Sequence, residues 1–121
     1  MTIIFTALDF VAQAKQNIVE IGLDAAKKSL DTSLVLDVRE SSEYAAGHLP
    51  GAFNIPRGVL EFRIGAHPDF QDKQDAHILV YCQSGGRSAL ATEALNKMGY
   101  TNAVSMAGGF KVWAESGYEI V

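Results

Sequence analysis

Cysteine is scarce in this chain, whose 121 residues include one cysteine, three histidines and three prolines. A lone cysteine, Cys82, excludes an intrachain disulfide, and the dispersed His48, His67 and His77 give it no spacing of metal ligands. We therefore expect no metal site and no cofactor. In a reducing compartment the thiol stays free. Cys82 is thus either a buried filler of the core or a chemical reagent.

Long hydrophobic runs are missing as well. No segment approaches the roughly 18 to 20 apolar residues that span a bilayer, and Asp9 interrupts the N-terminus before it reaches the length of a signal peptide. The net charge of −4 gives no positive field for nucleic acid or an anionic membrane. We expect a cytoplasmic protein without nucleic-acid or membrane partners, in which an anionic substrate is held by a local site.

Repeats, low-complexity tracts and Gly/Ser-rich linkers do not divide the sequence. A content of 48% hydrophobic and 20% charged residues suits a globular chain with one core. We therefore expect one domain over residues 1–121.

Short apolar runs alternate with segments of helical periodicity along the chain. The expected helices cover residues 8–17, 24–30, 41–46, 58–64 and 88–98, with a last short helix around Phe110 and Trp113. The expected strands cover residues 18–21, 34–36, 52–55, 77–81 and 103–106. This alternation predicts an α/β fold, with an open, mostly parallel sheet, helices on both faces and ligands bound beyond the carboxyl ends of the strands.

The loop that begins at Cys82 follows the clearest strand and opens a predicted helix. Gly85 and Gly86 allow backbone dihedrals that turn consecutive N–H groups toward one point. The helix adds the positive end of its dipole, and Arg87 adds a charged donor fork suited to oxyanions. The same groups stabilise a thiolate, which is the nucleophilic form of cysteine. A merely structural thiol needs neither the two glycines nor the arginine.

Two chemistries suit a cysteine in a ring of amides without a partner base. A Cys/His hydrolase is disfavoured, because no histidine is spaced to lie beside Cys82 and His77 stands a full strand length away. Phosphatase chemistry and sulfur transfer remain. Four residues separate Cys82 from Arg87, one fewer than in cysteine phosphatases. The shorter loop closes a tighter ring, which suits one sulfur atom better than a tetrahedral phosphate.

Four sequence elements, taken together, resemble the rhodanese, or thiosulfate sulfurtransferase, family. They are the loop Cys82–Arg87, the segment Asp37–Tyr44, the turn Gly47–Ala52, and the pair Gly108-Gly109 followed by Trp113. They occur in the family's order within residues 34–118, and residues 1–17 form an N-terminal extension. The resemblance implies a rhodanese-like, open, mostly parallel five-stranded sheet flanked by helices on both faces.

The resemblance also implies a reaction and a set of site residues. Cys82 would take sulfur from an anionic donor such as thiosulfate, or from a persulfide, and pass it to cyanide, a thiol or a protein acceptor. Arg87 would hold the departing sulfonate. The backbone N–H groups of the other loop residues would surround the persulfide sulfur; these residues are Gln83, Ser84, Gly85, Gly86 and Ser88.

Four further signature residues are interpreted as structural, forming a charged and hydrogen-bonded network at the sheet edge. They are Asp37, Arg39, Glu43 and His48. Arg57 and Arg63 lie in a segment that often borders the active-site mouth in this family, and they receive no role. The alternatives to sulfur transfer are a non-catalytic rhodanese-like interaction or regulatory module, and a small phosphatase or arsenate reductase. Retention of both Cys82 and Arg87 counts against the first.

Overall fold

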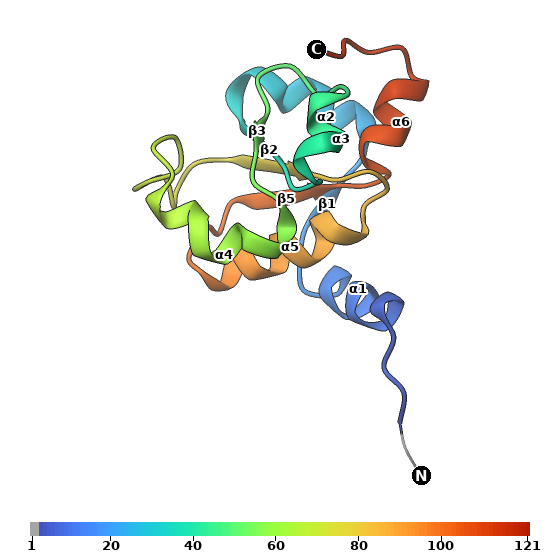
Figure 1. Cartoon of the computed structure of the whole chain (residues 1–121), viewed down its shortest axis with the longest axis vertical. Helices are drawn as coiled ribbons and strands as arrows, with labels where there is room; N and C mark the ends of the chain where they lie inside the picture. The colour runs from blue at the N-terminus through green and yellow to red at the C-terminus, as the bar shows by residue number, and fades with distance from the viewer. Residues whose placement is uncertain (1–2) are drawn as a thin grey trace.

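The structure, a computed structural model, describes residues 3–121 as a parallel sheet between two layers of helices (Figure 1). The helices are α1 (Ala7–Lys15), α2 (Leu23–Ser29), α3 (Ser41–Ala45), α4 (Leu60–Arg63), α5 (Gly86–Lys97) and α6 (Gly109–Glu115). The strands are β1 (Glu20–Ile21), β2 (Leu34–Asp37), β3 (Phe53–Asn54), β4 (Ile78–Tyr81) and β5 (Ala103–Met106). Short 3-10 turns occupy Leu30–Thr32, Arg57–Val59 and Ile64–Ala66.

All strand pairings in the sheet are parallel, and the strand order is β1-β5-β4-β2-β3. The central strand β4 lies between β2 and β5, so that Leu79 is level with Val35 on one side and Val104 on the other. The predicted α/β fold is confirmed, and the sheet is wholly rather than mostly parallel. Its carboxyl edge brings together the segments that follow β2, β4 and β5.

Side chains of the strands alternate between two apolar clusters, one on each face. On one face Val80 and Leu36 pack with residues of α4 and α5, among them Leu60 and Leu95. On the other face Leu79, Val35 and Met106 pack with residues of α2, α3 and α6, which include Ala26, Tyr44 and Trp113. Figure 1 shows these helices on opposite sides of the sheet. Both faces are covered, as the apolar strands require.

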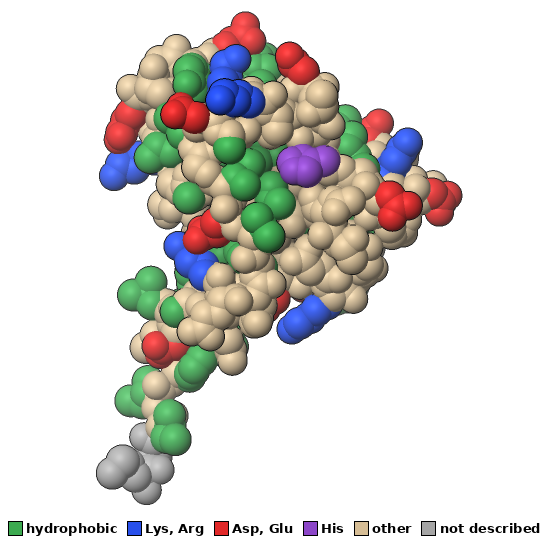
Figure 2. Space-filling model, turned by 180° about the vertical axis from the view of Figure 1, so that it is seen from behind, with side chains coloured by type: hydrophobic (Ala, Val, Ile, Leu, Met, Phe, Trp, Pro, Cys, Tyr) green, Lys and Arg blue, Asp and Glu red, His purple; other side chains and the backbone are tan. Residues whose placement is uncertain are grey.

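Helix α1 packs against α5 and projects from the body of the molecule. Thr6 caps it, accepting a hydrogen bond from the Asp9 amide, while the Asp9 carboxylate accepts one from the Thr6 amide. Hydrophobic side chains stand exposed along this extension, as Figure 2 shows; they are Ile3, Ile4, Phe5, Leu8 and Phe10. The predicted N-terminal helix is present, and only its inner face is covered.

Several element boundaries differ from those expected. Helix α5 begins at Gly86 rather than Ser88, because Gly85 has a φ of +112° and turns the chain into the helix two residues early. The segment expected as one helix over residues 58–64 is instead α4 between two 3-10 turns. None of the helices described within residues 3–121 is long and apolar enough to cross a membrane.

Candidate active site

Cys82 directly follows the central strand β4, at the carboxyl edge of the sheet. Its side chain turns to the α4/α5 face, where it belongs to the same apolar cluster as Val38 and Ala91. The residue is 1% exposed. The thiol is therefore at the site where a doubly wound fold binds ligands, but it is largely shielded from water.

The start of α5 brings a backbone amide to the sulfur. The Gly85 N–H donates a hydrogen bond to Cys82 Sγ at 3.1 Å. The first backbone bond of the helix runs from the Ala89 N–H to the Gly85 carbonyl, so the amides of the first turn have no partner within the helix. This arrangement places the positive end of a twelve-residue helix beside the thiol. The two loop glycines predict an anion cradle here, and the Gly85 amide is the part of it that bonds to the sulfur.

A pair of buried hydroxyls lies beneath the thiol, and sequence reasoning missed it. Cys82 Sγ is 3.5 Å from Ser88 Oγ, to which the hydroxyl of Ser105 in β5 donates at 2.9 Å. Ser88 in turn donates to the Gly85 carbonyl at 3.1 Å. Both serines are 0% exposed. The sequence did offer one sign of this pair, because Ser105 is a polar residue between Val104 and Met106 in an otherwise apolar strand.

The N-terminus of α6 holds the cysteine loop from the other side. The amides of Phe110 and Lys111 donate to the carbonyls of Cys82 and Gln83, at 2.8 and 3.0 Å. Gly109, with a φ of +59°, permits this approach, because a Cβ there would lie 2.5 Å from the Cys82 carbonyl oxygen. The amides of Phe110 and Lys111 thus fix the backbone of the loop, and Gly109 leaves the space that they need.

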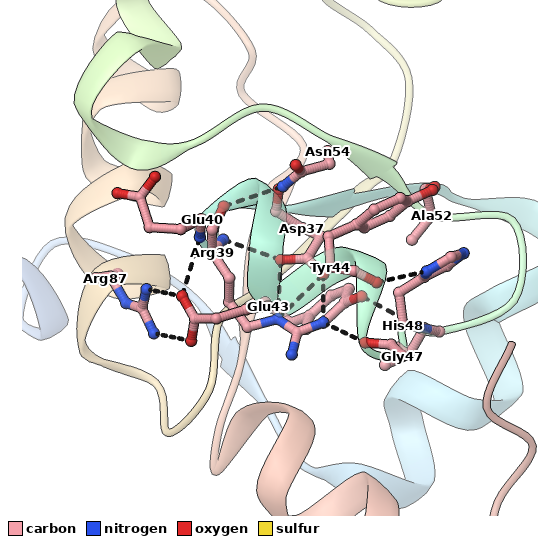
Figure 3. Close-up of polar contacts among 12 residues, drawn as sticks. Asp37, Arg39, Glu40, Glu43, Tyr44, Gly47, His48, Ala52, Asn54 and Arg87 are labelled. Atoms are coloured by element: carbon pink, nitrogen blue, oxygen red, sulfur yellow. Dashed lines mark hydrogen bonds and ion pairs between the residues drawn. The ribbon is translucent and has the colours of Figure 1, made fainter.

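Arg87 is engaged by a carboxylate, which the sequence did not predict. Its Nη1 and Nη2 donate to the two oxygens of Glu43 at 2.7 and 3.0 Å (Figure 3). Hydrogen bonds from Arg87 hold the pKa of Glu43 at about 2, well below its ordinary 4.5. Nothing in the spacing marks this pair, since its members are 44 positions apart in the sequence. The predicted sulfonate holder therefore has a protein partner.

Of the four signature residues expected to form one network, Glu43 pairs with Arg87 instead, and the other three lie around the turn after α3, as Figure 3 shows. Asp37 and Arg39, 0% and 2% exposed, make a buried ion pair with an N–O distance of 2.7 Å. Arg39 also donates to the Gly47 carbonyl at 2.7 Å and lies over the ring of Phe110 in α6. The ring of His48 stacks on that of Tyr44, with ring centroids 3.8 Å apart. The network joins the turn after α3 to the helix that clamps the cysteine loop.

Three further residues take no part in the contacts around Cys82, Arg87 and Arg39; they are Arg57, Arg63 and His67. Arg57 pairs with Glu61 at 2.8 Å, and Arg63 is exposed. His67 packs edge-on against Phe53 and Phe70. Within residues 3–121 no group of three or more His, Cys, Asp or Glu side chains is arranged to hold a metal ion.

The rhodanese-like domain family matches residues 22–116 of the chain. Thiosulfate sulfurtransferase 16, a chloroplastic protein of Arabidopsis thaliana, is 40% identical over 91 residues, in a match that covers 68% of this chain and 74% of that protein. Human thiosulfate:glutathione sulfurtransferase is 38% identical over 90 residues, in a match that covers 67% of this chain and 78% of the human protein.

A solved structure from Rhodopseudomonas palustris CGA009 is similar over the whole chain. It is described as a protein of unknown function and possible tyrosine phosphatase, and it shares 29% identity with a TM-score of 0.84. The similarity covers 100% of this chain and 98% of that one, so it includes the N-terminal helix α1. The family match over most of the chain, the identity to two sulfurtransferases and the all-parallel sheet agree. The chain belongs to the rhodanese-like domain family.

Proposed function

We propose that this protein is a sulfurtransferase that carries sulfane sulfur on Cys82 as a persulfide. The observation that carries the proposal is the cradle itself: a shielded cysteine at the carboxyl end of the central strand, with the Gly85 amide 3.1 Å from Sγ and the open first turn of α5 beside it. Amides aimed at one point stabilise a small, soft anion such as the terminal sulfur of a persulfide.

The proposed reaction has two displacement steps. The Cys82 thiolate attacks the outer sulfur of thiosulfate, an S–S bond forms, and the original S–S bond breaks so that sulfite leaves with the bonding electron pair. The terminal sulfur of the resulting persulfide is then attacked by a thiolate or cyanide, and Cys82 leaves as the thiolate. A persulfide donor enters the first step in the same way, with its thiolate as the leaving group. The sulfurtransferases among the relatives, one named for thiosulfate and glutathione, support this chemistry.

The loop residues have separate parts in this proposal. The N–H groups of the residues that follow Cys82 surround the terminal sulfur; these residues are Gln83, Ser84, Gly85, Gly86 and Ser88. Hydrogen bonds to Glu43 are the main cause that raises the pKa of the Arg87 guanidinium, and the negative charge of Cys82 adds to it. Arg87 therefore lies within electrostatic reach of Cys82 as a positive charge paired with Glu43.

Intact-mass measurement tests the proposal. Incubation with thiosulfate or an alkyl persulfide should add the mass of one sulfur atom, located on Cys82 by peptide mapping and removed by cyanide. Cys82→Ser should abolish the mass gain and the transfer. Gln83→Ala is the matched control, because Gln83 is exposed beside the cysteine and contributes its backbone rather than its side chain. Turnover in the serine variant would refute the covalent mechanism.

The same protein should also be assayed for hydrolysis of an aryl phosphate, because the similar Rhodopseudomonas palustris protein is described as a possible tyrosine phosphatase. We expect no hydrolysis, since the four residues between Cys82 and Arg87 should close a ring of amides too tight for a phosphate. Efficient hydrolysis without persulfide formation would assign the cradle to phosphate instead.

A further inference from the structure

The guanidinium of Arg87 is already bound to a carboxylate of the protein, and this affects which sulfur donor it can bind. Both terminal nitrogens of its guanidinium bond to Glu43, with N–O distances of 2.7 and 3.0 Å. This bidentate arrangement is the one in which guanidinium binds carboxylates most strongly. A sulfonate that used the same fork would have to displace Glu43.

Glu43 is itself held in place from a second side. The Glu40 N–H donates to Glu43 Oε1 at 3.0 Å, and the Glu43 N–H bonds back to Glu40, closing a capping box at the start of α3. Oε1 thus accepts from both the α3 backbone and Arg87, while Oε2 accepts from Arg87 alone. The carboxylate is therefore preorganised against the guanidinium rather than free to swing away.

The local charge balance follows from this pairing. Arg87 contributes one positive charge, Glu43 cancels it, and the negative charge of Glu40 also acts on Arg87. Glu43 is only partly exposed, at 33% of its side-chain area, so water screens the pair incompletely. Thiosulfate therefore brings two negative charges to a guanidinium that Glu43 already balances, and only the backbone dipole at the start of α5 is left to attract them.

We propose that Glu43 is a donor-selecting residue: by binding Arg87 it withholds the guanidinium from thiosulfate and favours donors that lack a sulfonate, namely persulfides of thiols. This inference rests on the proposed sulfur transfer at Cys82 and adds the class of donor. The pKa of Glu43, held at about 2, keeps the carboxylate charged at physiological pH. The selection is therefore permanent and does not depend on pH near neutrality.

The variant that tests the inference is Glu43→Gln. The glutamine carbonyl can still accept from the Glu40 N–H and from Arg87 Nη1, which preserves the cap of α3. Its amide nitrogen faces Arg87 Nη2 and cannot accept from it, so the variant removes the carboxylate charge and one of the two hydrogen bonds. The matched control is Glu61→Gln, which removes a carboxylate from another Arg–Glu pair, Arg57–Glu61, at 2.8 Å. Both variants change the net charge equally.

The measurement is the rate of Cys82 persulfide formation with two donors, thiosulfate and the persulfide of an uncharged alkyl thiol. Removing a unit charge beside a dianion predicts about a tenfold gain in kcat/KM for thiosulfate, with the persulfide donor changed less than twofold. Thiosulfate should also bind about tenfold more tightly when Glu43→Gln is placed in the Cys82→Ser background, where no chemistry occurs. That binding would not change if Glu43 only held the fold together.

Each outcome has a separate meaning. A selective gain with thiosulfate in Glu43→Gln, absent in Glu61→Gln, supports the inference. Equal gains in the two variants, or an unchanged donor ratio while both donors still load sulfur, overturns it and leaves sulfur transfer standing. Failure of the unaltered protein to load sulfur from either donor overturns the proposed function itself.

Discussion

Replacing Gly109 with alanine tests whether the second glycine pair shapes the cysteine loop. A Cβ at this position would lie 2.5 Å from the Cys82 carbonyl oxygen and 2.8 Å from both the carbonyl carbon and oxygen of Gln83. All three contacts are backbone atoms, which cannot swing away like a side chain. Their relief requires that the loop and the start of α6 separate, breaking the hydrogen bonds from Phe110 and Lys111.

The expected loss of stability has two parts. An alanine at a φ of +59° costs about 1–2 kcal/mol for the left-handed conformation, and the steric overlap adds about 1–3 kcal/mol. Gly117→Ala isolates the first part, because its φ is +81° and a methyl group there would meet nothing within 4 Å. Urea unfolding should therefore show a loss of about 2–5 kcal/mol for Gly109→Ala and only about 1–2 kcal/mol for Gly117→Ala.

A functional readout completes this test. Under conditions in which Gly109→Ala remains folded, it should load sulfur on Cys82 more slowly, because the loop carbonyls have moved, whereas Gly117→Ala should load at the unaltered rate. Equal losses of stability in the two variants, with equal loading rates, would refute the claim that α6 fixes the loop by close approach.

Three further changes test the network and the cradle. Asp37→Ala should lower the free energy of unfolding by about 3–5 kcal/mol, because it leaves the buried charge of Arg39 unpaired; a loss below about 1 kcal/mol in urea unfolding would contradict this. The pKa of Glu43 is lowered from 4.5 to about 2 by Arg87, so the stability from this pair is present above pH 4.5 and is lost as pH falls toward 2. Between pH 4.5 and 2 the unfolding temperature of Glu43→Gln should therefore fall less than that of the unaltered protein. Equal falls in the two proteins would exclude the Glu43–Arg87 pair as a source of stability. One glycine inserted after Gly85 should weaken sulfur transfer, because the amides no longer converge on the terminal sulfur; native rates in a normally folded variant would show that ring size does not matter.

The fold was predictable because the strands are compact and the breaks between elements carry glycine. Residues 77–81 and 103–106 are short apolar runs that helical periodicity does not fit, and they are β4 and β5 in the structure. The boundaries were less predictable, because they depend on single dihedrals. Gly85 adopts a φ of +112°, so α5 starts at Gly86, two residues before the periodicity alone indicates.

The Gly85 amide beside Cys82 was predictable, but the partners of Arg87 and Ser88 were not. The loop glycines and the helix that follows imply amides around Cys82 from local sequence alone. The Glu43–Arg87 pair and the Ser88–Ser105 contact join segments that are far apart in the chain. Such contacts are set by the order of strands in the sheet, which composition and spacing do not encode.

The two hydrogen bonds from α6 to the cysteine loop have a consequence for how the family diversifies. They hold the carbonyls of Cys82 and Gln83 at the start of the loop, while α5, which begins at Gly86, holds its end. The side chains of Gln83 and Ser84 are exposed and take no part in either anchor. Mutation can therefore replace them without rebuilding the scaffold. Under the proposed function, these two positions could adapt the loop to different sulfur acceptors while Cys82 keeps its place.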